Sequence, residues 1–325
     1  MKQWKVLVSR RIPQEGLDLL AEACELTMHQ EDRPMTRSEL LAAAAGKDGV
    51  LCLLTDKINA ELFDAAPTVR AYANFAVGYD NMDVAEASRR RIPLSNTPDV
   101  LTDATADMAW ALLFATARRV VESDAVMRSG SWAGWGPLQF IGGDITGATL
   151  GIVGAGRIGA AMTARSNGFR MRVLYTDARR NEQLEQSTGA VFVSFDELLR
   201  QSDYISVHVP LLPETRHLFN EAAFARMKPT ACLINTARGP VIDEAALVRA
   251  LRDKTIAGAG LDVYEHEPAM SEGLAALPNV VLTPHTASAT HASRNGMARK
   301  AATNLLAMLR GERAPDCLNP EIYPG

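Results

Sequence analysis

Short apolar runs alternate with stretches of helical periodicity along most of the chain. The apolar runs, which predict buried strands, are residues 4–8, 49–54, 69–74, 150–153, 171–175, 204–208, 231–235, 258–262 and 280–283. Helical spacing of apolar positions begins near residue 13 and at residue 83, and it extends over residues 103–128, 244–252 and 290–310. Strands that alternate with helices are typical of parallel sheets with crossover helices, so we predict an α/β fold.

The most specific motif joins one of these strands to a helix. After the apolar run that begins at Leu150, glycines stand at positions 154, 156 and 159. In this spacing Gly154 permits a tight turn, Gly156 lets backbone amides approach a pyrophosphate, and Gly159 lets the helix pack on its strand. Asp177 lies at about the 20-residue offset expected of a carboxylate that accepts ribose hydroxyls. The motif predicts a dinucleotide site, and the alternative is a glycine-rich turn that binds nothing.

Two domains of ordinary size follow from this pattern. The alanine-rich helix over 103–128 is expected to connect two lobes, and the helix over 290–310 to run back toward the first. We therefore predict a discontinuous, flavodoxin-like substrate-binding domain of residues 1–98 and 288–325, and a dinucleotide-binding Rossmann domain of residues 99–287. Both are expected to be doubly wound parallel sheets, with a cleft between them.

Composition argues against several other classes of protein. With 47% hydrophobic residues in 325, the chain can bury a large core, and a net charge of −4 offers no basic surface for nucleic acid. No segment reaches the ~18 apolar residues of a membrane span, and no secretory leader pattern is seen, so we expect a cytoplasmic protein without nucleic-acid or membrane partners. The four cysteines form no Cys-x-x-Cys pair and the six histidines no helical ligand pair, so we expect reduced thiols and no metal.

Three residues that follow strand-like runs in the second half have the chemistry of a hydride-transfer site. They are Arg238, Glu267 and His285. A planar guanidinium matches a carboxylate, so Arg238 is expected to hold a 2-oxo acid and polarise its carbonyl. His285 is expected to donate a proton, with Glu267 on its other ring nitrogen favouring the imidazolium form. Each residue alone could be an ordinary surface or loop residue, but their presence beside a dinucleotide motif favours catalysis.

The same blocks resemble a known family. The stretch Met227-Lys228-Pro229, leading into Leu233-Ile234-Asn235-Thr236-Ala237-Arg238-Gly239, is similar to the D-isomer-specific 2-hydroxyacid dehydrogenases. Segments 53–57, 76–80, 96–98 and 132–137 are most similar to glyoxylate and hydroxypyruvate reductases, including 2-ketogluconate reductases. The resemblance implies that Arg238, Glu267 and His285 are the catalytic residues, and that a small 2-oxo acid is reduced to the D-2-hydroxy acid.

The resemblance also implies which residues bind the two ligands. The backbone amides around Val77 and Gly78 would bind the substrate carboxylate. The other substrate contacts would be Leu54, Arg238, His285 and, at the far end of the substrate, Arg294. The cofactor contacts would be Gly154, Ala155, Gly156, Arg157, Ile158, Gly159, Asp177, Ala178, Arg179, Val209, Pro210, Thr236, Ala237, Arg238, Asp262, His285, Thr286 and Ala287. A homodimer is implied as well, with the helix from Asp103 as a contact surface and with Trp135 either walling a pocket across the interface or simply packed.

Two choices stay open at this point. Asp177 favours NAD(H) because it would repel a 2′-phosphate, whereas Arg179 and Arg180 could pair with that phosphate and leave NADP(H) open. Reduction of glyoxylate, hydroxypyruvate or 2-ketogluconate is the leading function. The alternatives are a phosphoglycerate dehydrogenase-type oxidoreductase, for which no dedicated phosphate cluster is seen, and a non-catalytic NAD-sensing binding protein, against which the three catalytic candidates argue.

Overall fold

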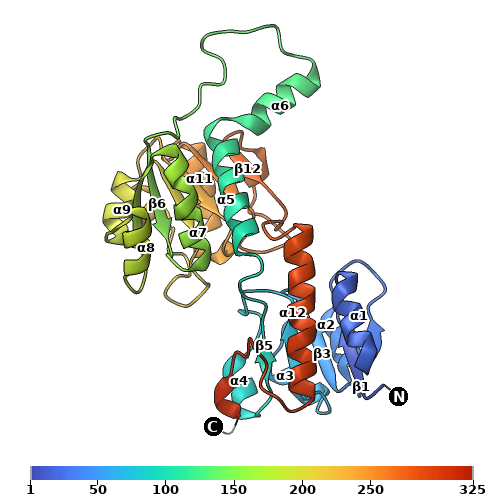
Figure 1. Ribbon diagram of the computed structural model, residues 1–325. Coiled ribbons are helices and arrows are strands. Elements are labelled where there is room, and N and C mark those ends of the chain that lie inside the picture. The colour runs from blue at the N-terminus through green and yellow to red at the C-terminus, as the bar shows by residue number, and fades with distance from the viewer. Residues whose placement is uncertain (1, 324–325) are drawn as a thin grey trace. The chain divides into compact units, whose positions relative to one another are not determined.

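The computed structural model describes residues 2–323, and the chain divides into two compact units. One unit is Met1–Leu101 with Ala289–Gly325, and the other is Thr102–Ser288. The sequence prediction placed these boundaries after residue 98 and before residue 288. Each unit has its own parallel sheet, so the predicted fold class of two parallel-sheet α/β domains is confirmed (Figure 1).

The first unit is built on a sheet with strand order β2-β1-β3-β4-β5, in which all pairs are parallel. The strands are β1 (Trp4–Val8), β2 (Cys24–Met28), β3 (Gly49–Cys52), β4 (Ala71–Asn74) and β5 (Leu94–Ser95). β3 and β4 are buried at every position, so they read in the sequence as unbroken apolar runs. The prediction missed β2 and β5, which are the two edge strands.

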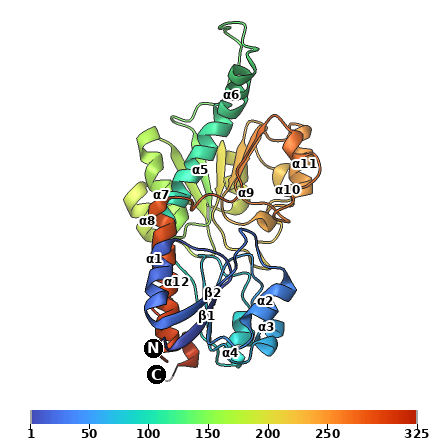
Figure 2. The same cartoon turned by 90° about the vertical axis from the view of Figure 1, so that its right-hand side faces the viewer.

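Helices cover both faces of this sheet (Figure 2). On one face α1 (Gln14–Ala23) lies beside α12 (His291–Leu309), and α12 packs on β3 and β4. A Cβ at Gly16 would lie 2.7 Å from the carbonyl oxygen of Ala298, so the close approach of the two helices depends on that glycine. The other face carries α2 (Arg37–Ala44), α3 (Ala60–Ala65) and α4 (Val84–Arg89). The two ends of the chain therefore share one core.

The second unit is built on a wider parallel sheet with strand order β12-β11-β10-β9-β6-β7-β8. Its strands are β6 (Thr149–Val153), β7 (Arg172–Thr176), β8 (Val191–Phe192), β9 (Tyr204–Val207), β10 (Cys232–Asn235), β11 (Gly258–Leu261) and β12 (Val280–Leu282). From β6 the chain adds strands first on one side and then, from β9, on the other. Ligands of such sheets bind at the carboxyl ends of the strands beside this switch point.

Two apolar clusters sandwich the second sheet. Alternate strand positions point to opposite faces, so Leu233 joins one cluster while its neighbours Cys232 and Ile234 join the other. The helices of this unit are α5 (Thr102–Ala117), α6 (Val120–Ser129), α7 (Arg157–Ser166), α8 (Glu182–Thr188), α9 (Phe195–Gln201), α10 (Glu221–Phe224) and α11 (Glu244–Arg252). The four cysteines are free thiols. Among residues 2–323, no helix is long and apolar enough to cross a bilayer.

The single helix predicted over 103–128 is wrong, because the structure has two helices there. α5 ends at Ala117, Arg119 adopts a left-handed conformation with φ of 52°, and α6 begins at Val120. The carbonyl of Ala117 accepts the N–H of Gly143 at 2.9 Å instead of continuing the helix. A side chain at Gly142 would collide with that same carbonyl, so the returning segment fits only as glycine. The helix is thus interrupted by a contact with residues far along the chain.

Candidate active site

The glycine motif forms the turn between β6 and α7, and a different physical reason favours glycine at each of the three positions. Gly154 has φ of 97°, and a Cβ there would lie 2.7 Å from the backbone carbonyl carbon of His208. A side chain at Gly159 would collide with the carbonyl of Gly154. At Gly156, by contrast, no heavy atom of the described residues lies within 4 Å of the added Cβ position. Two glycines therefore serve packing, and the third keeps an open cradle at the N-terminus of α7.

Residues after β7 hold this turn. Asp177 Oδ2 accepts the N–H of Ala155 at 2.6 Å, and Asn181 Nδ2 donates to the carbonyl of Ala155 at 2.8 Å. Asn181 also caps α8 by accepting the N–H of Leu184 at 3.0 Å. The sequence analysis identified Asp177 but missed Asn181, which only its place at a helix N-cap could have indicated.

The two arginines after Asp177 have different surroundings. Arg180 forms a two-point ion pair with Glu185, at 2.8 and 2.7 Å, and hydrogen bonds from Arg180 and Tyr175 lower the pKa of Glu185 to about 2. Arg179 is exposed, and the described residues include no ion-pair partner for it. Of the two, Arg179 is the side chain with its guanidinium available for a ligand.

Arg238 follows β10 in a turn that is held by the side chain of Asn235 and by close packing at Gly239. The buried amide of Asn235 spans the turn, since its Oδ1 accepts the N–H of Ala237 at 3.0 Å and its Nδ2 donates to the carbonyl of Arg238 at 2.9 Å. A side chain at Gly239 would collide with the backbone of Tyr264. The Arg-Gly pair thus packs directly on the loop that carries Glu267.

Glu267 and His285 form the pair that the sequence predicts. Glu267 Oε2 lies 2.9 Å from His285 Nδ1, and Glu267 Oε1 accepts the N–H of Tyr264 at 3.1 Å. Partial burial acts to raise the pKa of Glu267, but the hydrogen bond and charge of His285, the Tyr264 amide and the charge of Arg238 together lower it. Glu267 is therefore ionised near neutral pH. Both side chains are partly exposed, 31% for Glu267 and 28% for His285, so Nε2 of His285 is the ring atom that can reach a substrate.

Asp262 positions the loop that carries His285. Its carboxylate is fully buried and accepts the hydroxyl of Thr283 at 2.6 Å, the N–H of Thr286 at 2.8 Å and the N–H of Ala287 at 2.7 Å. His285 itself has φ of 55°, a left-handed conformation that a histidine adopts only when its surroundings hold it there. The predicted contact of Asp262 with a cofactor stays a prediction, whereas its contacts within the protein are those of a loop clamp.

The residues present fit a dinucleotide. The open cradle at Gly156 and the N–H groups of the first turn of α7 suit a pyrophosphate. Thr236, at the carboxyl end of β10, has a buried hydroxyl without a hydrogen-bond partner among the described residues, which suits a bound ligand. Val209 and Pro210 follow β9 next to the turn. The other predicted substrate residues, Leu54, Val77, Gly78 and Arg294, belong to the first unit.

Comparison with known proteins agrees with this geometry. The family model described as D-isomer specific 2-hydroxyacid dehydrogenase, NAD binding domain, matches residues 110–287. The chain is also 49% identical over 322 residues to the glyoxylate reductase of Thermococcus onnurineus, covering 98% of this chain and 96% of that protein. The chain belongs to the D-isomer-specific 2-hydroxyacid dehydrogenase family. The resemblance found in the sequence is thereby confirmed, and this dehydrogenase is an oxidoreductase.

Solved structures extend the similarity over the whole dehydrogenase. The TT0316 protein from Thermus thermophilus superposes with a TM-score of 0.90 at 43% identity, covering 97% of this chain and 99% of the other. The NADPH-dependent glyoxylate/hydroxypyruvate reductase from Sinorhizobium meliloti, solved with NADP and malonate, has a TM-score of 0.87 at 33% identity, covering 100% of this dehydrogenase and 99% of that chain. The NAD-binding family and this NADP-bound relative together support an NAD(P) cofactor.

Proposed function

We propose that this dehydrogenase reduces a small 2-oxo acid, namely glyoxylate, hydroxypyruvate or 2-ketogluconate, to the D-2-hydroxy acid with NAD(P)H. The observation that supports it best is the 2.9 Å pair of His285 and Glu267, with Arg238 close enough to influence the carboxylate. The first of these substrates is also the one named for the relative at 49% identity.

In this proposal each residue has one task. When bound, NAD(P)H would supply the hydride for the carbonyl carbon of the substrate. His285 Nε2 donates the proton that the carbonyl oxygen takes up, so the product is an alcohol and the histidine is left neutral. Glu267 stabilises the imidazolium before transfer and orients its ring. The guanidinium of Arg238 holds the substrate and stabilises the negative charge that develops on the carbonyl oxygen.

Backbone amides of Val77 and Gly78 are proposed to bind the substrate carboxylate together with Arg238, and Leu54 and Arg294 to contact the remainder of the substrate. The cofactor would lie on the glycine turn, with Asp177 toward the adenosine ribose. For the choice of cofactor we propose NADH as the better substrate, with NADPH also used. Asp177 disfavours a 2′-phosphate, while the exposed Arg179 offers it one positive charge and Arg180 is engaged by Glu185.

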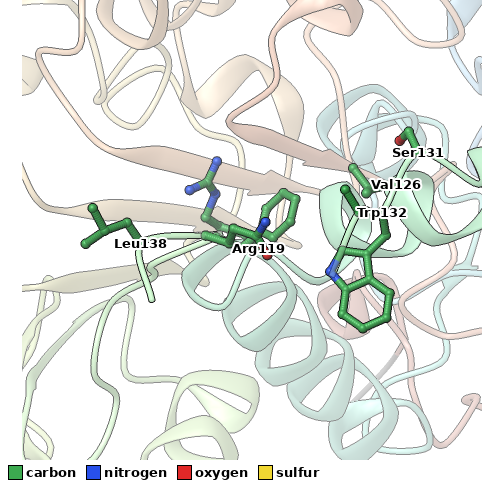
Figure 3. Close-up of a pocket in the computed structure, with 8 residues that line it drawn as sticks. Arg119, Val126, Ser131, Trp132 and Leu138 are labelled. Carbon is green, nitrogen blue, oxygen red and sulfur yellow. The ribbon is translucent and has the colours of Figure 1, made fainter. Parts of the chain in front are cut away.

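We further propose a homodimer formed through the segment 120–141. No residue of α6 is buried within its own chain, and Trp135 and Leu138 are 83% and 82% exposed. In Figures 1 and 2 this segment projects from the body of its own unit. The same segment contains a pocket of about 480 Å³ lined by Arg119, Val126, Ser131, Trp132, Ala133, Leu138, Gln139 and Phe140 (Figure 3). A two-fold interface pairs the same surface of both copies, so a segment that carries both apolar projections and a pocket supports this proposal.

The experiment that tests the oligomer compares Trp135→Glu with Val191→Glu. Val191 is a 48% exposed apolar residue on the edge strand β8, outside the segment. We expect wild type and Val191→Glu to sediment at twice the 35.1 kDa chain mass, and Trp135→Glu as the single chain. A wild-type protein that sediments as a single chain contradicts the proposal.

The function is tested by the loss of NADH or NADPH absorbance with a panel of 2-oxo acids. We expect turnover with glyoxylate, hydroxypyruvate or 2-ketogluconate and none with Arg238→Ala. Turnover confined to a phosphorylated 2-oxo acid would favour the phosphoglycerate dehydrogenase alternative. Tight NADH binding without turnover of any 2-oxo acid would favour a sensor.

A further inference from the structure

Three successive carbonyl groups after β4 point into the body of the first unit. Each is held by one hydrogen bond: the carbonyl of Ala76 accepts the N–H of Thr97 at 2.9 Å, that of Val77 accepts Asn96 Nδ2 at 2.6 Å, and that of Gly78 accepts Asn74 Nδ2 at 3.0 Å. Two of the three donors are therefore side-chain amides, from asparagines that are themselves buried, with 8% of Asn96 and 0% of Asn74 exposed.

This arrangement fixes the direction of the amide groups in the same segment. In a trans peptide the C=O of one residue and the N–H of the next point in opposite directions, and residues 76–79 have no cis bond. The N–H groups of Val77, Gly78 and Tyr79 therefore point away from the interior. None of these three N–H groups donates a hydrogen bond to a described residue of the first unit. Val77 and Gly78 are partly exposed and Tyr79 is exposed, so an external anion can reach them.

We infer that Asn96 and Asn74 are positioning residues that orient two of these amides, those of Gly78 and Tyr79, toward the carboxylate of the 2-oxo acid, an inference that rests on the proposed function. The third amide, that of Val77, is oriented by the bond from the Thr97 N–H to the carbonyl of Ala76. Successive N–H groups that converge on one side of the backbone form an anion site, and hydrogen bonds to a carboxylate are stronger than those between neutral groups. The asparagines do not touch the substrate themselves. They hold the peptide planes in the one orientation in which the donors face outward.

Further hydrogen bonds keep both asparagines in place. Asn74 Nδ2 also donates to Asn81 Oδ1 at 3.0 Å, and Asn81 Nδ2 donates to the carbonyls of Leu53 at 3.1 Å and Asp56 at 2.9 Å. The segment 76–79 is thereby tied to the loop that contains Leu54, the other proposed substrate residue of this unit.

Asn96 is supported from the other end of the chain. Its carbonyl accepts Asn304 Nδ2 from α12 at 3.0 Å, and Asn304 is itself buried. This bond fixes the backbone of Asn96, so the point from which its side chain reaches the carbonyl of Val77 is well defined.

A buried asparagine elsewhere in the same unit provides the control. Asn319 is fully buried, accepts the N–H of Leu94 at 3.0 Å and donates to the carbonyl of Ile92 at 2.8 Å, and within residues 2–323 no hydrogen bond joins it to segment 76–79. Its loss should reduce stability as much as the loss of Asn96, without changing the amides. The comparison therefore separates a positioning role from a merely structural one.

The test uses the full-length protein saturated with NADH and the unreactive 2-oxo acid analogue oxamate. For Asn96→Ala we expect oxamate binding in calorimetry to weaken about ten-fold and the KM for glyoxylate to rise by a similar factor. The kcat at saturating glyoxylate and the Kd for NADH should stay close to wild type. Asn319→Ala should lower Tm and leave the oxamate Kd unchanged. If Asn96→Ala does not fold, the same measurements are made on Asn96→Ser and Asn74→Ala.

Each other outcome has a defined meaning. A wild-type oxamate Kd in the folded Asn96 and Asn74 variants overturns the inference, and so does an equal loss in Asn319→Ala. A wild-type protein that binds no oxamate also overturns it. If wild type binds oxamate and Asn96→Ala weakens that binding, while no 2-oxo acid is reduced, the proposed function fails and the positioning role of Asn96 stands.

Discussion

Asp177 Oδ2 lies 2.6 Å from the backbone nitrogen of Ala155, so the acidic residue at the end of β7 is bound to the glycine turn itself. Its other oxygen, Oδ1, has no hydrogen-bond partner among the described residues. One oxygen therefore serves the fold, and the other is available to a ribose hydroxyl. A substitution at Asp177 should change both the turn and the choice of cofactor.

For cofactor choice we expect Asp177→Ala to raise kcat/KM for NADPH relative to NADH, because a negative charge near the 2′-phosphate is removed. Affinity for both cofactors should fall, since the Ala155 amide loses its acceptor. Arg179→Ala should lower the NADPH-to-NADH ratio, and the matched variant Arg180→Ala should lower it less, because Arg180 is engaged by Glu185. Steady-state kinetics with both cofactors measures the ratio, and equal effects of the two arginines would contradict the assignment.

For catalysis we expect His285→Gln to lower kcat by ~10²–10⁴, since the group that donates the proton is lost. The Kd for NADH, measured by fluorescence titration, should change little. His291→Gln is the control, because His291 is an exposed histidine at the start of α12. A His285→Gln enzyme with near wild-type kcat would remove His285 from the proposed mechanism.

For the loop clamp we expect Asp262→Ala to lower the free energy of unfolding by about 1–3 kcal/mol, because one buried and two partly buried donors lose their acceptor. It should also lower kcat, since the backbone on either side of His285 is released. Thr283→Val removes one donor from the same carboxylate and should have a smaller effect on both quantities. Urea denaturation and steady-state kinetics test this together. Unchanged kcat in a destabilised Asp262→Ala protein would show that the clamp is not needed for catalysis.

A pH-dependent contribution to stability is expected from Glu265. Burial acts to raise its pKa, but the hydrogen bond from His217 at 2.5 Å, the Glu244 amide and the charges of His217 and His266 lower it. A carboxyl group with a lowered folded pKa stabilises the protein above its unfolded pKa, and this contribution is lost as the pH falls through the folded value.

Glu265→Gln should therefore lower Tm by a few degrees at pH 7, and the difference from wild type should narrow as the pH falls below about 4.3. Differential scanning fluorimetry from pH 7 to about pH 3 measures it. Glu182→Gln, on the first turn of α8, is the control and should show no such pH trend. A constant difference at all pH values would contradict the ionic origin.

Several parts of the fold were predictable because they depend on neighbours in the chain. The helix over 244–252 was predicted with the bounds that the structure shows, since its apolar face repeats with helical period and Asp243 caps its first turn. The glycine turn was predictable for the same reason, because its three glycines act within one strand-turn-helix unit. The identities of Arg238, Glu267 and His285 followed from their positions after successive apolar strands.

Other features depended on residues that meet only in the folded chain. The break at Arg119 comes from Gly143 bonding to Ala117, and periodicity within 103–128 gives no indication of it. The edge strands β2 and β5 lack the apolar runs of central strands, so pairing with a neighbour defines them. β8 is only two residues long, so its short apolar run at residues 190–193 gives a weak signal.

The sequence by itself determined the alternation of strands and helices and the glycine turn, because these depend on local spacing along the backbone. It also predicted Arg238, Glu267 and His285 as the reactive side chains from their places after apolar runs. The tertiary structure alone decided that Asp262 clamps the His285 loop and that Asn96 and Asn74 donate hydrogen bonds to the carbonyls of Val77 and Gly78. The physical reason is that a hydrogen bond between residues distant in sequence depends on where the packed elements place the two partners.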